Sequence, residues 1–317
     1  MIPQQALDNE FAREVESGLT RDGQKTLPSR YLYDDVGSAL FEAITCLPEY
    51  GLTRADARVI HAHAEDMVEC LPGNLVVAEL GSGTGAKTRA ILERIRLRQS
   101  VVYYPIDVSA AALAKCVLDL GGLGSVIPLE ASYLHGLREV AARRVRGQAL
   151  LVLFLGSTIG NFEPDAAIDF LRAMRQVLAP GDALLLGTDL VKRLQVMMDA
   201  YDDPTGVTAA FNLNLLGRIN RELDADFNLR QFEHAIRYNE AARRIEMHLR
   251  SRVHQIVSVR EASLIVDFAA GETIRTEACH KFRREQISTL ACAAGFRLKA
   301  QWVDEEWGFA ENLMICP

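Results

Sequence analysis

Short apolar runs alternate with amphipathic stretches through the middle of the chain. The runs rich in β-branched and other apolar residues predict strands at residues 75–80, 101–106, 125–129, 149–155 and 183–187. Helices are predicted to begin near Lys87, Ala110, Pro164 and Val191, and a further helix is predicted over residues 54–70. This alternation is typical of a parallel sheet covered by helices. Residues 151–155 are apolar throughout, which indicates a strand that is buried on both faces.

The pattern differs on both sides of this region. Residues 1–55 mix short helical patterns with turn signals, and a helix is predicted over residues 38–45. After residue 192, helical stretches precede two segments of period 2, residues 244–251 and 262–268, which predict antiparallel strands in an insert. The chain closes with a predicted helix and two strands, at residues 284–294, 296–303 and 312–316.

A glycine-rich turn, Gly-Ser-Gly-Thr-Gly at residues 81–85, follows the first predicted strand of the sheet. Glycine lets a ligand approach the backbone closely, and the next helix points the positive end of its dipole at that ligand. Residues 81–88 nearly fit a P-loop, but Ala86 stands where the second glycine is required. Asp107 closes the next strand at a spacing that suits ribose hydroxyls. A dinucleotide or S-adenosylmethionine fits this pattern, and Glu79 favours S-adenosylmethionine.

A second polar turn, residues 156–162, ends the apolar strand at residues 149–155. Ligands of open α/β sheets lie beyond the carboxyl ends of the strands. We therefore expect Asn161, whose amide both donates and accepts hydrogen bonds, to lie near the reactive end of the cofactor.

Composition and charge narrow the class of protein. A chain of 317 residues, 49% hydrophobic, can form one large domain or two interleaved domains. Its net charge of -7 argues against a nucleic-acid partner, and the basic run at residues 143–146 is interpreted as a solvated helix end. The sequence predicts no membrane span and no signal peptide, so we expect a soluble, cytoplasmic protein. Six scattered cysteines predict reduced thiols, and the histidine and cysteine spacings predict no metal site.

Seven motifs resemble the histidine Nα-methyltransferase family of ergothioneine biosynthesis, in order along essentially the whole chain. They lie at residues 31–41, 47–50, 79–84, 154–161, 185–191, 201–203 and 276–283. The resemblance implies S-adenosylmethionine as methyl donor and three methylations of the α-amine of histidine, which give hercynine. It also implies an α/β fold with a Rossmann-like class I methyltransferase domain (residues 56–192 and 282–317). An interleaved α+β domain (residues 1–55 and 193–281) would bind the small-molecule amino acid, and we expect a monomer.

The same resemblance implies a role for individual residues. The amine and carboxylate of the substrate would be held by Tyr50, Asn161 and Tyr201, with Tyr33 near the amine. The pocket would be lined by Phe41, Gly156, Thr208 and Met247, and Glu277 would bind the imidazole. The cofactor would be held by Gly81, Gly83, Lys87 and Asp107, with its adenine near Ser132 and Tyr133.

Two departures from the family pattern leave alternatives open. Cys279 stands where the family has a serine for the second imidazole nitrogen, and a thiol is a weaker hydrogen-bond partner. An Nα-methyltransferase of another aromatic amino acid is therefore an alternative. Ser132 and Tyr133 replace an Asp-Phe pair that recognises adenine, which keeps a cofactor-binding protein without turnover as a second alternative.

Overall fold

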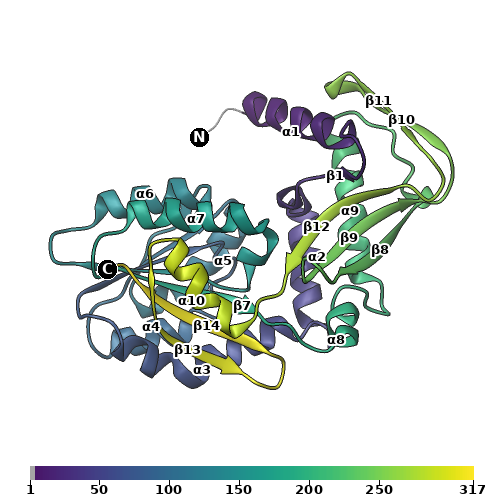
Figure 1. Ribbon diagram of the computed structural model, residues 1–317. Coiled ribbons are helices and arrows are strands. Elements are labelled where there is room, and N and C mark those ends of the chain that lie inside the picture. Colours follow the sequence, from purple (N-terminus) through teal and green to yellow (C-terminus); the bar gives the residue numbers. More distant parts are fainter. Residues whose placement is uncertain (1–3) are drawn as a thin grey trace. The chain divides into compact units, whose positions relative to one another are not determined.

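The computed structural model describes residues 4–317, which fall into two compact units (Figure 1). Unit 1 contains the described residues up to Gly51 together with Arg193–His280. Unit 2 contains Leu52–Lys192 together with Lys281–Pro317. Each unit has a sheet of its own, so each is described separately.

Unit 2 is built on a mixed sheet with the strand order β13-β14-β7-β6-β2-β3-β4, and β5 also pairs with β3. The strands from β4 to β7 pair in parallel, whereas β14 lies antiparallel between β7 and β13. The predicted parallel sheet and the two predicted closing strands are confirmed, and these two strands form an antiparallel hairpin. The strands are β2 (Leu75–Leu80), β3 (Val102–Asp107), β4 (Ser125–Val126), β5 (Leu129–Glu130), β6 (Ala149–Phe154), β7 (Ala183–Asp189), β13 (Arg297–Asp304) and β14 (Phe309–Ile315).

One predicted strand of this sheet is interrupted. Residues 125–129 form the two short strands β4 and β5 in place of one strand. Pro128 lies between them, and its nitrogen carries no hydrogen for the ladder. The pattern of apolar residues does not reveal this interruption, because apolar residues lie on both sides of Pro128.

Helices cover both faces of the unit 2 sheet. The side chains of Val76, Ala78 and Leu80 pack in a core with helices α6, α7 and α10, while Leu75 and Val77 pack with helices α3, α4 and α5. This division follows from the alternation of side chains along a strand. The helices are α3 (Leu52–Glu69), α4 (Arg89–Arg96), α5 (Ala110–Leu120), α6 (Tyr133–Arg143), α7 (Pro164–Val177) and α10 (Arg284–Ala293), with 3-10 turns η2 (Gly121–Leu123) and η3 (Thr158–Asn161).

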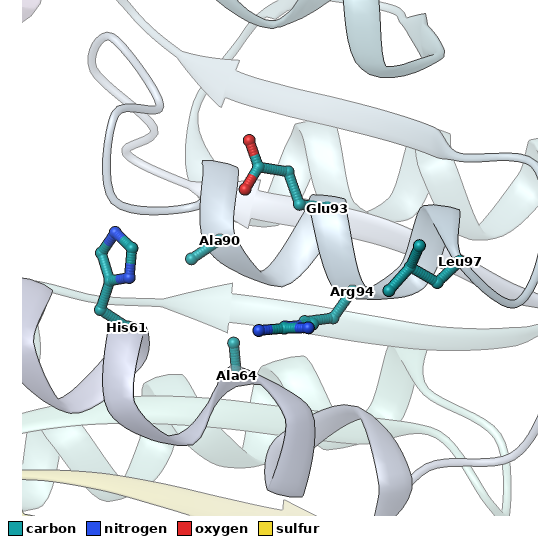
Figure 2. A pocket seen from close by; sticks show the side chains of 6 residues that line it. All are labelled: His61, Ala64, Ala90, Glu93, Arg94 and Leu97. Atoms are coloured by element: carbon teal, nitrogen blue, oxygen red, sulfur yellow. The ribbon is translucent and has the colours of Figure 1, made fainter.

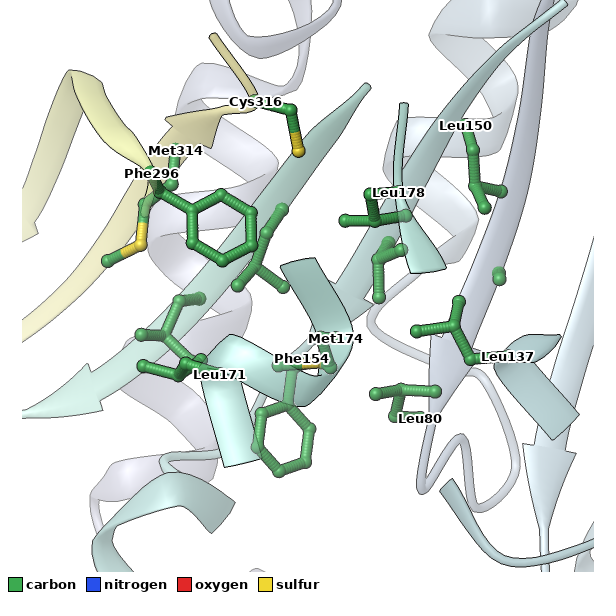
Figure 3. Close-up of a cluster of buried hydrophobic side chains, with 14 of the residues drawn as sticks. Leu80, Leu137, Leu150, Phe154, Leu171, Met174, Leu178, Phe296, Met314 and Cys316 are labelled. Atoms are coloured by element: carbon green, nitrogen blue, oxygen red, sulfur yellow. The ribbon is translucent and has the colours of Figure 1, made fainter. Parts of the chain in front are cut away.

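Figure 3 shows the core on the side of α6, α7 and α10. Leu137 from α6, Leu171 from α7 and Phe154 from β6 are fully buried there. The sequence analysis interpreted the basic run at residues 143–146 as the end of a helix, but it did not predict the rest of α6. Gly136 allows α6 to pack closely on β3, because a Cβ at this position would lie 2.5 Å from Ile106 Cγ2.

Unit 1 combines helices with a sheet of strand order β1-β12-β9-β8 and a separate β10-β11 hairpin. Its helices are α1 (Gln4–Leu19), α2 (Asp35–Cys46), α8 (Leu194–Asp199) and α9 (Val207–Glu222), with 3-10 turns η1 (Ser29–Leu32), η4 (Leu229–Gln231) and η5 (Arg260–Ala262). Its strands are β1 (Lys25–Thr26), β8 (Phe232–Asn239), β9 (Arg244–Ser251), β10 (Gln255–Val259), β11 (Leu264–Phe268) and β12 (Thr273–His280).

The sequence predicted β9 and β11 but missed β8, β10 and β12. Strand β8 carries Glu233, His234 and Arg237 among its apolar residues, so its period-2 signal is weak. It is held by antiparallel pairing with β9, which runs from Phe232–Ser251 to Asn239–Arg244. Long-range pairing therefore decides these strands.

Asp189 joins two segments of unit 2. The chain leaves the unit at Lys192 and returns to it at Lys281. The buried carboxylate of Asp189 forms ion pairs with Lys192 and with Lys281, the latter at 2.9 Å, and accepts a hydrogen bond from Trp307 Nε1 at 3.0 Å. Burial alone would raise the pKa of Asp189, but the two lysines lower it. The motifs at residues 185–191 and 281–283 thus have a structural role at this junction.

Candidate active site

The glycine turn after β2 is fixed to the end of β3. The amide of Gly81 donates to the Ile106 carbonyl at 2.8 Å, and the amide of Gly83 donates to Asp107 Oδ2 at 2.9 Å. The other oxygen of Asp107 accepts from the Ser109 amide at 3.0 Å. Asp107, predicted to hold ribose, therefore also holds the loop in place.

The three glycines of this turn all have positive φ values, but their surroundings differ. Gly81, Gly83 and Gly85 have φ values of +69°, +51° and +68°. A Cβ on Gly83 would meet no atom within 4 Å, whereas a Cβ on Gly85 would lie 2.7 Å from Leu120 Cδ1 and 2.8 Å from Cys116 Sγ. Gly83 thus leaves open space for a ligand, and Gly85 allows the loop to pack against α5.

Tyr133 lies beside the glycine turn. Its hydroxyl oxygen is 3.3 Å from the position that a Cβ on Gly81 would occupy, and its ring contacts Phe154 and Phe170 edge-on. Burial, followed by the charge of Asp107, raises the pKa of Tyr133 to about 12. Ser132 is exposed and occupies the N-cap position of α6 without a capping hydrogen bond from its side chain.

Lys87, a predicted cofactor residue, belongs to a group of charged side chains in unit 2. It forms an ion pair with the fully buried Asp56, whose Oδ2 also accepts from the Gly156 amide at 2.9 Å. Burial opposes the charge of Lys87, but Asp56 outweighs it and raises the pKa of the lysine. The structure thus brings Lys87 and Gly156 together through Asp56, a residue that the sequence analysis did not identify.

Glu311 on β14 completes this charged group. Its carboxyl is fully buried, and its pKa is raised well above the ordinary value by burial and by Asp56. Neither carboxyl oxygen of Glu311 has a hydrogen-bond donor among the described residues, and the same holds for Asp56 Oδ1. Burial and the nearby charge of Asp56 therefore both favour the neutral form of Glu311.

Glu79, near the end of β2 and just before the glycine turn, is a second buried acid. Its Oε2 accepts hydrogen bonds from Thr88 Oγ1, at 2.6 Å, and from the Tyr103 hydroxyl. Burial raises the pKa of Glu79 to about 7, although these hydrogen bonds and Lys87 partly oppose the shift. Glu79 therefore changes its charge near neutral pH.

The turn after β6 has a left-handed backbone that presents polar groups at the strand end. Gly156 and Ser157 have φ values of +70° and +58°. The side chain of Ser157 holds this conformation by accepting a hydrogen bond from the Asp189 amide at 2.8 Å. Asn161 is the last residue of η3, which follows at once. Asn161 therefore lies in the turn that follows the carboxyl end of β6.

In unit 1, the aromatic residues predicted to contact the substrate form one cluster. Ring centroids lie 5.4 Å apart for Tyr33 and Phe41, 6.2 Å apart for Phe41 and Tyr50, and 6.2 Å apart for Tyr50 and Tyr201. Phe211 on α9 joins the cluster at 5.5 Å from Tyr33, a contact that the sequence analysis missed. Its helical spacing from Thr208 was the available signal.

The remaining predicted substrate residues lie on α9, β9 and β12. Thr208 is buried in the first turn of α9. Met247 and Glu277 are register partners across β9 and β12, so their side chains leave the sheet on the same side. Cys279, two positions further along β12, shares that face. All four side chains are less than 10% exposed.

A surface hollow in unit 2 is separate from these residues. It lies between α3 and α4 and is lined by His61, Ala64, Ala90, Glu93, Arg94 and Leu97 (Figure 2). None of the predicted site residues lines it, so it does not define the active site. Within residues 4–317, no cluster of histidine, cysteine or acidic side chains is arranged to hold a metal ion, and no helix is long and apolar enough to cross a membrane.

The mostly parallel sheet with helices on both faces and the glycine turn beside Asp107 define unit 2 as a Rossmann-like α/β fold. The chain belongs to the family of histidine-specific, S-adenosylmethionine-dependent methyltransferases, whose family model matches residues 11–315.

Known relatives span nearly the whole chain. It is 43% identical over 305 residues to the histidine N-alpha-methyltransferase of Mycobacterium tuberculosis, covering 95% of this chain and 93% of the relative. Identity to the enzyme of the same name from Mycolicibacterium smegmatis is 42% over 313 residues, covering 96% and 94%. An L-tryptophan methyltransferase of Psilocybe serbica is 24% identical over 318 residues, covering 92% and 88%.

Proposed function

We propose that this protein converts L-histidine to Nα,Nα,Nα-trimethylhistidine (hercynine) by three successive methyl transfers, as a step of ergothioneine biosynthesis. Membership of the histidine-specific family and the similarity to the mycobacterial enzymes support this substrate. The observation that carries the proposal is the aromatic cluster of unit 1, which contains Tyr33, Tyr50 and Tyr201.

These tyrosines suit an amine that gains methyl groups in steps. A hydroxyl oxygen accepts a hydrogen bond from the amine and orients its lone pair, and the ring faces attract the methylated cation. We propose that Tyr50, Tyr201 and Asn161 hold the amine and carboxylate and that Tyr33 lies near the amine. The nitrogen must be neutral when it attacks, and removal from water lowers the pKa of an ammonium group. The main task of these residues is therefore alignment.

The loop of unit 2 fits S-adenosylmethionine. The open space over Gly83 permits close approach of a ligand, and Asp107 offers a carboxylate to ribose hydroxyls. We propose that Gly81, Gly83, Lys87 and Asp107 hold this cofactor, with Tyr133 and Ser132 near the adenine. When bound, the cofactor supplies an electrophilic methyl group on a sulfonium.

The imidazole is assigned to Glu277, which would act as a charge-assisted acceptor for a ring N–H. Phe41, Thr208, Met247 and Gly156 would line the rest of the pocket. Cys279, on the same face of β12 as Glu277, favours a second candidate substrate, another aromatic amino acid such as tryptophan, because its thiol is a weak partner for the other imidazole nitrogen.

Mass spectrometry of products formed from S-adenosylmethionine with histidine, tryptophan or tyrosine tests the proposal. We expect mono-, di- and trimethylated histidine in sequence. Absence of trimethylhistidine would refute the hercynine assignment, and a methylated tryptophan or tyrosine in its place would support the second candidate.

Two variants test the residue assignments separately. Glu277→Ala is expected to raise the KM for histidine at least about tenfold, since a hydrogen bond to a charged group is lost, while the affinity for S-adenosylmethionine stays within about twofold. Asp107→Ala is expected to do the reverse. Calorimetric titration of each variant with histidine and with S-adenosylmethionine gives both affinities. An equal loss of affinity for histidine and for S-adenosylmethionine in either variant would contradict the assignment.

We further infer that the enzyme acts in the cytoplasm as a monomer. The scattered cysteines without disulfide spacing support a reducing compartment. Light scattering of the purified chain tests the oligomeric state.

A further inference from the structure

A buried amide in unit 1 joins segments that carry three of the proposed substrate residues. Asn212 on α9 is fully buried and follows Phe211 of the aromatic cluster. Its Oδ1 accepts from Thr276 Oγ1 at 2.6 Å, and its Nδ2 donates to the His248 carbonyl at 3.0 Å and to His234 Nδ1 at 2.9 Å. Both hydrogens of the amide nitrogen are therefore donated, and the amide oxygen accepts one hydrogen bond.

His234 extends this connection to Tyr201. His234 Nε2 lies 2.8 Å from the Tyr201 carbonyl oxygen, which can only accept a hydrogen bond. Nε2 therefore carries the proton, and Nδ1 is the acceptor that receives the Asn212 amide. This tautomer also fixes which end of the Asn212 amide is the oxygen, in agreement with the bond from Thr276.

Thr276 connects the amide to Glu277. It lies in a β-bulge, because the register of β12 on β9 shifts between Arg275 and Glu277. A bulge turns the side chains next to it, and here the following residue is the proposed imidazole ligand. The Asn212 bond to Thr276 therefore fixes the bulge that directs Glu277.

The third contact of Asn212 is with the strand that carries Met247. The His248 carbonyl follows Met247 on β9, and Met247 is the register partner of Glu277. A single amide thus restrains the backbone beside Tyr201, Met247 and Glu277, residues far apart in the sequence.

We propose that Asn212 is a positioning residue that sets the distance between the amine end and the imidazole end of the amino-acid site. This inference rests on the proposed function, because it assigns the amine end to Tyr201 and the imidazole end to Glu277. The consequence is substrate specificity. A fixed distance between the two ends of the site accepts the imidazole of histidine and disfavours the larger indole of tryptophan. If the network loosens, affinity for histidine falls and discrimination against tryptophan weakens, while the cofactor loop in unit 2 is unaffected.

The test compares Thr276→Val, which replaces the hydroxyl by a methyl group of similar size, with Thr276→Ser, which keeps the hydroxyl and loses the methyl group. Asn212→Leu, which removes all three bonds, is the stronger perturbation. We expect Thr276→Val to raise the KM for histidine about tenfold and to lower the ratio of histidine to tryptophan kcat/KM, because a buried amide oxygen loses its donor. The KM for S-adenosylmethionine should stay within about twofold, and Thr276→Ser should resemble the wild type.

The network also predicts non-additivity. Asn212→Leu combined with Thr276→Val should have about the same KM for histidine as Asn212→Leu alone, because both remove one shared bond. If Asn212→Leu does not fold, the valine and serine variants of Thr276 still decide the question. The inference is overturned if Thr276→Val and Thr276→Ser have equal KM values and equal specificity ratios, or if the KM values for histidine and S-adenosylmethionine rise together.

The proposed function is judged on the wild type alone, so the two failures can be told apart. A wild type that methylates histidine while the two Thr276 variants behave identically retains the function and overturns the network. A wild type that methylates a different amino acid overturns the substrate, and the same variants then test the network with that amino acid. A wild type without activity on any amino acid overturns both.

Discussion

Gly83 and Gly85 share one turn and one backbone conformation, so alanine at each position separates the requirement for ligand space from the requirement for packing. In both variants an alanine must adopt positive φ, which costs about 1–2 kcal/mol, partly offset by about 0.4–1 kcal/mol from the stiffer unfolded chain. The Cβ at position 83 meets open space within 4 Å. The free energy of unfolding of Gly83→Ala should therefore fall by no more than about 1.5 kcal/mol.

At position 85 a second cost is added. The new Cβ would lie 2.7 Å from Leu120 Cδ1 and 2.8 Å from Cys116 Sγ, both fully buried on α5. Overpacking of this kind costs about 1–3 kcal/mol. We expect Gly85→Ala to be less stable than Gly83→Ala by that difference. We expect the opposite order for S-adenosylmethionine affinity. Gly83→Ala should lose more affinity than Gly85→Ala, because Gly83 faces the space proposed for the ligand.

Urea unfolding followed by tryptophan fluorescence measures this difference. The two tryptophans of the chain, Trp302 and Trp307, both lie in unit 2, so their fluorescence reports on the unit that contains the loop. Calorimetric titration with S-adenosylmethionine gives the affinities of the folded variants. Equal unfolding free energies for the two variants, or a larger loss in Gly83→Ala, would refute the assignment of Gly85 to packing.

Two further predictions concern acidic side chains. The pKa of Glu79 is about 7 in the folded protein against an ordinary value of 4.5, so its contribution to stability is fully present below about pH 4.5 and is lost as the pH rises through about 7. Relative to Glu79→Gln, the wild type should lose up to about 3 kcal/mol of unfolding free energy over that range, and a pH-independent difference in urea unfolding would contradict this. Asp203 accepts from the Val207 amide at 3.0 Å and the Thr208 amide at 2.7 Å at the start of α9, so Asp203→Ala should cost about 1–2 kcal/mol in thermal or urea unfolding. The exposed neighbour Asp202 is the matched control, and its alanine variant should stay within about 0.5 kcal/mol of the wild type; equal effects would argue against capping.

Local patterns in the sequence were enough for the parallel core and its loop. The apolar run at residues 75–80 and the glycines after it specify a strand and a turn through neighbouring residues alone, and β2 has the predicted bounds. The apolar run at residues 101–106 likewise predicts the strand that Asp107 ends. The motifs that carry the family resemblance likewise depend on residues close together in the chain.

Tertiary structure decided which distant residues meet. Asp56 and Glu311 are 255 positions apart, yet both lie in the group of buried side chains around Lys87. No local sequence pattern predicts that they meet. The bulge at Thr276 and the strand β8 depend on register with β9, which is set by pairing across the sheet. Periodicity reports whether a residue is buried, but the partner of a buried polar group is fixed only when separate segments pack. Local sequence patterns therefore indicate the sheet and the glycine turn, while the Asn212 network and the buried acid Glu311 near Asp56 emerge only from the folded chain.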